Sequence, residues 1–459
     1  SLRVLLACVF RIKMRKSCKK FRTPVVLLVV SLFSVGNTIC FPKEALPTES
    51  GYLNIVEKPG AMMFYAYYEA INSAQRISNT PILLWLHGGY GCSAMAANFY
   101  EIGPWLVDED LILHRNPASW NRIFGLLFVD NPIGSGFSIA PSNLAIPRTD
   151  EEVAEDLYSA LQEFFALNPL FCSRPFFVTG ESNGGKYVSS LAYYMVKRLD
   201  NGEPNALRVD GISIGDGWVD PVTQIRSFAS AAHAQGLIDF QQKLYLENLQ
   251  QQAVSLVRQQ KWNEAAVAGK RVEGWLTNVT DLACLLDTRR TFSYDTSENG
   301  TDYVSIFLNL RAIKEALRAD VNMSWKRCSE AVEKRMHADY MKSTKWKVEM
   351  LVKRMPVLLY QGQFDLGYAV STEEWLRSVE WSGVSEFWRS ERMLWKVGPV
   401  LAGYVRSHSN LSHVVVARAG HLSAADQKGS CQAMIESWVK NQAAANTDHI
   451  FQAPSWNIT

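Results

Sequence analysis

The sequence lacks the features that would point to nucleic-acid binding, to a repeat architecture or to a disordered chain. Its 47 Lys and Arg residues nearly balance 45 Asp and Glu, and no long run of one sign follows residue 23. A nucleic-acid-binding protein normally carries a basic patch, and none stands out here. No repeat of fixed period and no long low-complexity segment occurs. With 47% hydrophobic and 20% charged residues, the 459-residue chain instead has the composition of a globular protein with a large core.

Cysteine is scarce, and its spacing excludes the common zinc sites. The chain has eight cysteines, and no two of them form a C-x-x-C pair. Those outside the N-terminal segment are Cys92, Cys172, Cys284, Cys328 and Cys431. In a secreted protein this odd number predicts one or two disulfides and at least one free thiol. We therefore expect no bound metal, and no motif suggests a cofactor.

Long hydrophobic runs are also missing, apart from a short one near the N-terminus. Arg15-Lys16 and Lys19-Lys20 precede the apolar residues 24–35, and Gly36-Asn37-Thr38 follow them. A basic region, a short apolar core and small polar residues are typical of a secretory signal peptide. The run falls short of the roughly 20 residues that span a bilayer as a helix, and an uncleaved signal anchor is the alternative. We expect residues 1–40 to comprise the signal peptide and possible upstream residues before Met14, and to be removed.

Glycosylation sequons support this secretory route. Asn-x-Ser/Thr triplets begin at Asn278, Asn299, Asn322, Asn410 and Asn457. Each triplet alone is weak evidence, but together with a signal peptide they favour an N-glycosylated protein. We expect a product that is soluble after signal removal, and that is either secreted to the extracellular space or vacuolar.

Short apolar runs rich in β-forming residues alternate with helical patterns. The runs are 82–86, 126–129, 176–179, 211–214, 357–360 and 414–417, and helices are expected over 151–167 and 184–199. Strands alternating with helices predict an α/β fold, with a mainly parallel sheet covered on both faces. Between 222 and 350 buried strands disappear, which predicts a mostly helical cap insertion between two parts of the core, 41–221 and 351–445. Residues 446–459 form a C-terminal tail.

One strand-to-helix turn carries a candidate nucleophile. Residues 176–188 read FFVTGESNGGKYV, in which Ser182 stands between Gly180 and Gly184. G-x-S-x-G in a strand–turn–helix setting is typical of the nucleophile elbow of α/β-hydrolases, although the motif alone is weak. The following helix would offer backbone N–H groups to an oxyanion.

Candidate partners follow in the order that this fold requires, which is Ser, then Asp or Glu, then His. Asp365 comes just after the strand 357–360, and His421 just after the strand 414–417. A solvated turn carboxylate and a surface histidine are the alternatives for these two residues. Earlier in the chain, His87-Gly88-Gly89 follows the strand 82–86 and predicts a loop whose N–H groups approach a reacting carbonyl oxygen.

The chain resembles the serine carboxypeptidases, and more narrowly their plant serine carboxypeptidase-like branch, from about Phe41 to Lys440. The matching blocks are LLWLHGGYGCSAMAANFYEIGPW (83–105), LLFVDNPIGSGFS (126–138), FFVTGESNGGKYV (176–188), ISIGDGWVDPVTQ (212–224), VLLYQGQFDLGYAVSTEEW (357–375) and VVVARAGHLSAADQ (414–427). The resemblance implies an α/β-hydrolase fold with a helical cap, made as a secreted or vacuolar glycoprotein.

The resemblance also implies roles for individual residues. Ser182 would be the nucleophile, His421 the general base and Asp365 its orienting partner. The backbone N–H groups of Gly89 and Asn183 would form the oxyanion hole, and Cys92 would pair with Cys328. The positions that match the family's site for the substrate carboxylate are His87, Gly88, Glu101 and Glu181. Two glutamates facing a carboxylate require a proton, which implies an acidic working pH.

Several positions near the site depart from the family pattern. Members usually carry Asn at His87, Pro at Tyr90, Ser at Ala94, Tyr-Ala at Asn183-Gly184, Asn at Asp216 and Val-Pro at Ser423-Ala424. The positions that match the triad are unaltered.

The function that we expect is release of C-terminal amino acids from peptides through an acyl-enzyme on Ser182. One alternative is an acyltransferase, which the glutamate at 181 disfavours modestly because the acyltransferase relatives tend to carry Asp there. The other is a catalytically weakened binding or regulatory relative, which the departures favour. Side-chain preference and oligomeric state are not predicted by any motif.

Overall fold

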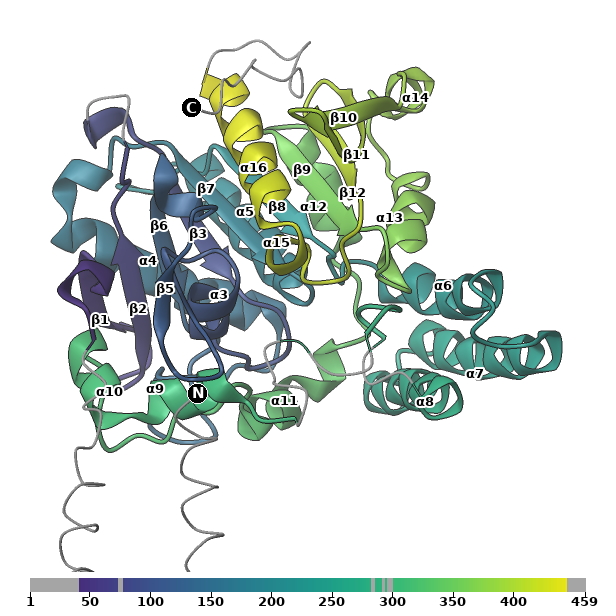
Figure 1. Cartoon of the computed structure of the whole chain (residues 1–459), viewed down its shortest axis with the longest axis horizontal. Coiled ribbons are helices and arrows are strands. Elements are labelled where there is room, and N and C mark those ends of the chain that lie inside the picture. Colours follow the sequence, from purple (N-terminus) through teal and green to yellow (C-terminus); the bar gives the residue numbers. More distant parts are fainter. Residues whose placement is uncertain (1–40, 73–76, 282–284, 291–293, 295–299, 444–459) are drawn as a thin grey trace, which may run out of the picture. The chain divides into compact units, whose positions relative to one another are not determined.

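A ten-stranded sheet runs through the protein in the order β1-β2-β6-β3-β7-β8-β9-β12-β11-β10 (Figure 1). The strands from β6 to β12 in this order pair in parallel, and those at both ends pair antiparallel. The strands are β1 (Glu49–Asn54), β2 (Met62–Tyr68), β3 (Ile82–Leu86), β6 (Gly125–Val129), β7 (Phe176–Glu181), β8 (Gly211–Gly215), β9 (Val357–Gly362), β10 (Met393–Val397), β11 (Val400–His408) and β12 (Leu411–Val416). A separate hairpin pairs β4 (Trp105–Val107) with β5 (Leu113–Arg115).

The computed structural model describes residues 41–72, 77–281, 285–290, 294 and 300–443. The predicted signal peptide and the tail lie outside these residues, as do Cys284, Asn299 and Asn457. The helices are α3 (Ala94–Tyr100), α4 (Asp150–Leu167), α5 (Gly184–Asp200), α6 (Pro221–Ala234), α7 (Phe240–Arg258), α8 (Trp262–Thr280), α9 (Tyr303–Asn309), α10 (Arg311–Leu317), α11 (Glu330–Met336), α12 (Lys345–Val352), α13 (Tyr368–Leu376), α14 (Val384–Arg389), α15 (Ser423–Asp426) and α16 (Lys428–Ala443). In the described part of the chain no helix has the length and apolar character to cross a bilayer.

The central strands are buried along their whole length, which explains why the sequence predicted them. Every residue of β3, β6, β7, β8 and β9 is buried, as expected for parallel strands covered on both faces. The predicted α/β architecture with a mainly parallel sheet is therefore confirmed. Several expected boundaries were wrong by two or three residues: β7 continues beyond 179 to Glu181, β9 continues beyond 360 to Gly362, and β12 begins at Leu411 rather than at 414.

The antiparallel strands β10 and β11 carry a weaker sequence pattern and were not predicted. In β10 only Trp395 is buried, and exposed or half-buried residues alternate with buried ones through much of β11. A strand that is solvated on one face shows no continuous apolar run, so the criterion that finds buried parallel strands misses it.

Helices cover both faces of the sheet. Phe176 and Phe177 are neighbours in β7 and therefore point to opposite faces. Phe176 packs edge-on against Phe165 of α4, and Phe177 packs edge-on against Trp438 of α16. Helix α5 lies on the α4 face, where it contacts α4, α12, β7 and β8. In Figure 1, α16 and α3 lie in front of the sheet while α5 and α12 lie behind it.

The helices α6, α7 and α8 form a group with a hydrophobic core of its own. Leu246 and Val254 of α7 pack in one cluster with Ile225 of α6 and Val272 of α8. Contacts join α6 to α7, α7 to α8, and α6 to α13 next to the sheet. The capping box of α7, in which Asp239 and Gln242 bond to each other's backbone, explains where that helix starts. Between β8 and β9, the described residues contain helices and loops without a strand.

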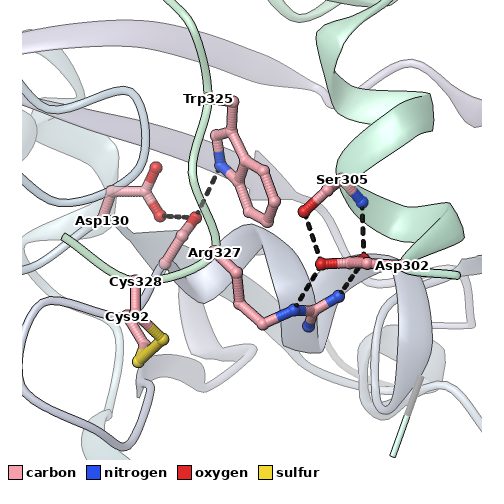
Figure 2. Close-up of a disulfide and its surroundings, with 8 residues drawn as sticks. Cys92, Asp130, Asp302, Ser305, Trp325, Arg327 and Cys328 are labelled. Carbon is pink, nitrogen blue, oxygen red and sulfur yellow. Dashed lines mark hydrogen bonds and ion pairs between the residues drawn. A yellow bond between two sulfur atoms is a disulfide. The ribbon is translucent and has the colours of Figure 1, made fainter. Parts of the chain in front are cut away.

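A disulfide ties the segment after α10 back to the sheet layer. Cys92, which follows β3, is bonded to Cys328 (Figure 2). Next to it, Ser93 Oγ donates to Asp130 Oδ1 at 2.5 Å and accepts from Trp325 Nε1 at 3.0 Å. Arg327 pairs with Asp302 at the start of α9. This is the pairing that the family resemblance implied, and it brings two segments 236 residues apart together.

Candidate active site

Ser182 occupies a sharp turn between β7 and α5. Its backbone φ of 57° lies in the left-handed region, which is unusual for a residue other than glycine. The Ser182 N–H donates to Gly215 O at 2.9 Å, and its carbonyl accepts from Trp218 N at 2.8 Å. These bonds hold the strained turn, so the serine side chain is presented at the carboxyl end of the sheet.

The glycines around Ser182 are required by the close approach of the neighbouring strand. A Cβ on Gly180 would lie 2.5 Å from the Leu86 carbonyl oxygen, and one on Gly184 would lie 2.3 Å from the same atom. A Cβ on Gly88 would lie 2.4 Å from Ser182 Cβ. Real Cβ atoms do not come this close to other heavy atoms. The G-x-S-x-G spacing and the Gly88 position therefore have one cause, the tight packing of the end of β3 against the turn.

The structure brings Asp365 and His421 into direct contact. Asp365 follows β9 and His421 follows β12, and His421 Nδ1 lies 2.6 Å from Asp365 Oδ2. The His421 N–H donates to Leu286 O at 2.7 Å, and the imidazole packs against the Tyr368 ring at 4.8 Å. Burial lowers the pKa of His421. His421 Nε2 is buried and makes no hydrogen bond with the described residues, so it is not hydrogen-bonded to Ser182.

Asp216 completes a buried group with these two residues. One polar side-chain atom from each of Asp216, Asp365 and His421 lies within 4.8 Å of the other two. Asp216 Oδ1 accepts from Gly362 N at 2.8 Å, and Oδ2 accepts from Ser423 Oγ at 2.9 Å. The sequence marked Asp216 and Ser423 only as separate departures from the family pattern. It did not reveal that they are hydrogen-bonded to each other.

A second group consists of the buried Glu101 and Glu181 and the half-buried His87, with one polar atom of each within 4.8 Å of the others. Burial raises the pKa of Glu181 well above its ordinary value, and the charge of Glu101 adds to the shift. Burial lowers the pKa of His87 to about 3, so its imidazole is neutral above that pH. Both carboxylate oxygens of Glu181 and Nδ1 of His87 lack partners among the described residues. Such a group can hold a small cation or, when a glutamate is protonated, an anion.

A cavity of about 450 Å³ opens over the turn. Gly89, Ser182 and Asn183 lie on its wall, which places both predicted oxyanion donors beside the serine. Gly89 has a φ of +73°, and a Cβ there would lie 2.3 Å from Cys92 Sγ, so the loop conformation requires glycine. Aromatic side chains form much of the remaining wall, namely Tyr90, Trp218, Phe228, Tyr340 and Tyr368. Helix α8 contributes Glu273, whose carboxylate accepts from Tyr340 OH at 2.8 Å.

A buried lysine supports the same turn and was missed in the sequence. Lys186 lies in the first turn of α5, and its Nζ is 3.0 Å from Tyr90 OH and 2.9 Å from Asp150 Oδ2. It also donates to the Asp339 carbonyl oxygen at 2.6 Å. The family usually has Pro at position 90. Tyr90 instead provides a hydroxyl that is a hydrogen-bond partner for the lysine, which gives this departure a structural role. These bonds join the predicted oxyanion loop to the helix that follows Ser182.

The remaining predicted positions are distributed over the surface and the core. Among the described cysteines outside the disulfide, Cys172 is exposed and Cys431 is buried with its Sγ 3.3 Å from Ser423 O. Asn278 and Asn322 are exposed, as a glycosylated side chain requires. Asn410 is half-buried, and its Nδ2 donates to Val352 O at 3.0 Å. Asn410 is therefore the least accessible of the described sequons.

Comparison with known proteins covers almost the whole chain. The family model described as serine carboxypeptidase matches residues 41–441. "Serine carboxypeptidase-like 50" of Arabidopsis thaliana is 46% identical over 94% of this chain and 96% of that protein. "Venom serine carboxypeptidase" of Apis mellifera is 31% identical over 84% of this chain and 82% of that protein.

A solved structure shares the fold. The crystal structure of Kex1(Δ)p, a prohormone-processing carboxypeptidase from Saccharomyces cerevisiae, superposes with a TM-score of 0.77. The two chains are 21% identical, and the similarity covers 88% of this chain and 93% of the yeast one. At this identity the likeness establishes the α/β-hydrolase fold alone.

Proposed function

This chain belongs to the serine carboxypeptidase family of hydrolases, and we propose that it releases C-terminal amino acids from peptides through an acyl-enzyme on Ser182. The hydrogen bond between His421 Nδ1 and Asp365 Oδ2, beside a serine on a strained turn, is the observation that supports this most strongly. Asp365 holds the imidazole in the tautomer that leaves Nε2 free to accept the serine proton. The unpartnered state of Nε2 in the structure suits that role.

The chemical step then follows from the groups around Ser182. The serine oxygen attacks the last peptide carbonyl while His421 takes its proton, and the carbonyl oxygen becomes an oxyanion. Backbone N–H groups of Gly89 and Asn183 would stabilise that charge. His421 returns the proton to the departing amine, and water then hydrolyses the acyl-enzyme by the same route. The Ser182–His421 hydrogen bond would form as the substrate arrives, since apo geometry in such sites is often loose.

Recognition of the free C-terminus is assigned to His87, Gly88, Glu101 and Glu181. A protonated Glu181 can donate a hydrogen bond to the substrate carboxylate, whereas an ionised one repels it. Because burial raises the pKa of Glu181, the residue keeps its proton in acid and loses it as the pH rises. The sign of this shift predicts carboxypeptidase activity that is highest at acidic pH and declines towards alkaline pH.

The helical region 222–350 is proposed to roof the site as a cap. Helix α8 already contributes Lys270, Glu273 and Thr277 to the wall of the cavity above Ser182. Peptide or protein C-termini are the substrates that such a cavity would take. A secretory route to the vacuole or the extracellular space, with glycans at the exposed Asn278 and Asn322, is consistent with an enzyme that works in acid.

One assay with two readouts tests the proposal. The mature protein and its Ser182→Ala variant are incubated between about pH 4 and pH 7 with an N-blocked dipeptide and, separately, with a fluorophosphonate probe. We expect release of the C-terminal residue and labelling of Ser182, both lost in the variant. Labelling without release would contradict the peptidase and favour acyl transfer to another acceptor. Absence of labelling would contradict Ser182 as a nucleophile altogether.

A further inference from the structure

We propose that Asp216 is a positioning residue which holds a proton in the active enzyme and donates it in a hydrogen bond to Asp365. The inference rests on the proposed function in one respect, that Asp365 orients His421. Asp216 follows β8 with a φ of 42°, a left-handed conformation that Asp and Asn tolerate better than most residues. Its N–H donates to Tyr360 O at 2.7 Å, so its backbone is fixed against β9.

The hydrogen bonds around Asp216 leave one place for a proton. Oδ1 accepts from the backbone N–H of Gly362 and therefore cannot carry the proton towards it. Oδ2 accepts from Ser423 Oγ through one lone pair, and one oxygen of Asp216 lies within 4.8 Å of an Asp365 oxygen and a His421 nitrogen. A carboxylic acid has one O–H donor, and we assign it to Oδ2 because the N–H of Gly362 occupies Oδ1. The acceptor is then the carboxylate of Asp365, to which Asp216 is hydrogen-bonded.

Two carboxyl groups this close and this deeply buried do not ionise together. Asp216 is fully buried, Asp365 is 2% exposed, and within the described part of the chain neither is hydrogen-bonded to a Lys or Arg. Like charges in contact force one group to keep its proton. Asp365 is the member that ionises, because the Nδ1–H of His421 donates to it at 2.6 Å. Burial raises the pKa of both groups; the charge of Asp365 raises that of Asp216 further, whereas the hydrogen bond with Asp216 lowers that of Asp365.

The other titratable groups near Asp216 come from each element packed around it. They are Glu181 of β7, Tyr360 of β9, Tyr368 of α13, Cys431 of α16 and, on the loop after β12, His421. Only His421 can carry a positive charge, and that charge lowers the pKa of Asp216. Burial and the charge of Asp365 act the other way and outweigh it, so the neutral form of Asp216 is favoured.

The hydroxyl of Ser423 is placed to form a hydrogen bond with an acid at position 216. Its hydroxyl lies 2.9 Å from Asp216 Oδ2 and 3.1 Å from Gly420 O. With an acid at 216, the hydroxyl donates to the lone pair of Oδ2 that the acid proton leaves unused. With Asn at 216, the amide N–H₂ would occupy this place, and the hydroxyl would turn its proton towards Gly420. The two departures from the family pattern are thus a matched pair.

A functional consequence follows at alkaline pH. When Asp216 loses its proton, Asp365 loses a hydrogen-bond donor and gains a repelling neighbour, so the Asp365–His421 geometry weakens. We therefore expect the reactivity of Ser182 to fall as Asp216 ionises. An amide at the same position cannot ionise and would keep the donor at every pH.

The test compares wild type with Asp216→Asn, using the rate of fluorophosphonate labelling of Ser182 between about pH 5 and pH 9. This probe has no carboxylate, so the Glu181 group does not affect it. We expect the Asn variant to react within about threefold of wild type in acid, and its alkaline decline to move upward by at least about one pH unit. If the alkaline decline of labelling is the same in the variant and in wild type, the titrating proton is not on Asp216. If the variant is not labelled at any pH, an anion at position 216 is needed. Either result overturns the proposal.

Thermal stability gives a readout that does not depend on activity. A folded-state pKa above the unfolded value means that the native protein binds the proton more tightly, so the stability contributed by Asp216 is lost as pH rises. The melting temperature of Asp216→Asn, relative to wild type, should therefore increase from about pH 5 to about pH 8. A difference in melting temperature between variant and wild type that does not change with pH contradicts the proposal. This readout holds even if Ser182 is unreactive and the proposed function fails.

Ser423→Ala provides a second variant with a milder change. Removing its hydroxyl removes a donor that favours the Asp216 anion, so the alkaline decline should move upward slightly in the wild-type background. In the Asp216→Asn background, Ser423→Ala should not shift the pH profile of labelling. An equal shift in both backgrounds would show that Ser423 acts independently of an acid at 216, and would overturn the pairing.

Discussion

Two buried acidic groups lie beside Ser182, and they differ in whether their polar atoms have partners. In the first, Asp365 is hydrogen-bonded to His421, and Asp216 to Gly362 and Ser423. In the second, both oxygens of Glu181 lack partners among the described residues, although the side chain is fully buried. An unsatisfied buried polar group costs about 1–3 kcal/mol, a cost that a ligand can offset. In the proposed function, the first group would thus be complete before substrate arrives, and the second would gain its hydrogen-bond partner from the substrate.

The largest effect is expected from Asp365→Asn, which disrupts the hydrogen-bonded group of Asp216, Asp365 and His421. The substitution replaces the acceptor of the His421 Nδ1–H by an amide and favours the wrong imidazole tautomer. We expect both fluorophosphonate labelling and C-terminal release to fall by about 10³–10⁴-fold. A melting curve close to that of wild type serves as the control for folding. Retention of more than about a tenth of either activity would remove Asp365 from its proposed role.

A smaller effect is expected from Glu181→Gln, which imitates a protonated glutamate in the second group. At about pH 5 the variant should keep kcat/KM within about threefold of wild type, since its amide still donates to the substrate carboxylate. As pH rises through the raised pKa of Glu181, the ratio of C-terminal release to fluorophosphonate labelling should fall in wild type and stay constant in the variant. Parallel pH profiles for the two proteins would show that Glu181 does not hold the functional proton.

His87→Asn installs the residue that the family usually carries, and a still smaller change is expected. The pKa of His87 is lowered to about 3 by burial, so the imidazole is already neutral throughout the working range. We expect kcat/KM to change by less than about tenfold, with no change in the shape of its profile between about pH 4 and pH 7. Loss of a titration step near pH 6 in the variant would show that His87 binds the carboxylate as a cation.

The smallest effect is expected outside both groups, at the ion pair between Arg327 and Asp302 beside the disulfide (Figure 2). The pair is partly exposed, so Arg327→Ala should cost about 1 kcal/mol of unfolding free energy and lower the melting temperature by about 1–2 °C. Labelling and C-terminal release should both stay near wild type. A loss of release alone would mean that this segment takes part in holding substrate.

The sequence predicted the parts of the fold that are buried on both sides. The parallel strands and the helices α4 and α5 carry continuous apolar runs or a 3.6-residue pattern, and their positions followed from these. Strands β1, β10 and β11 were not predicted, because a half-solvated antiparallel strand alternates polar and apolar residues over too short a length. Strand β2 was missed although six of its seven residues are buried. The helical region after β8 was anticipated from the loss of apolar runs.

At the site, the sequence predicted the turn that carries Ser182, but not the contacts between residues that are distant in the sequence. Ser182 follows from glycine spacing within one segment, and the chain order Ser, Asp, His restricts its partners. The bond between Ser423 and Asp216 joins residues 207 positions apart, and no pattern within either segment reports the other. Lys186 is similar: a lysine in a helix is expected at the surface, and only the fold brings Asp150 and Asp339 around it.

The most direct test of the difference between the two groups is a paired measurement on Glu181→Ala at about pH 5, of fluorophosphonate labelling and of C-terminal release from a blocked dipeptide. Labelling requires the first group alone, and release requires both. We predict that labelling stays within about threefold of wild type while kcat/KM for release falls by at least about 50-fold. If the two rates fall together, or if release is unaffected, the two groups do not have the separate roles assigned to them.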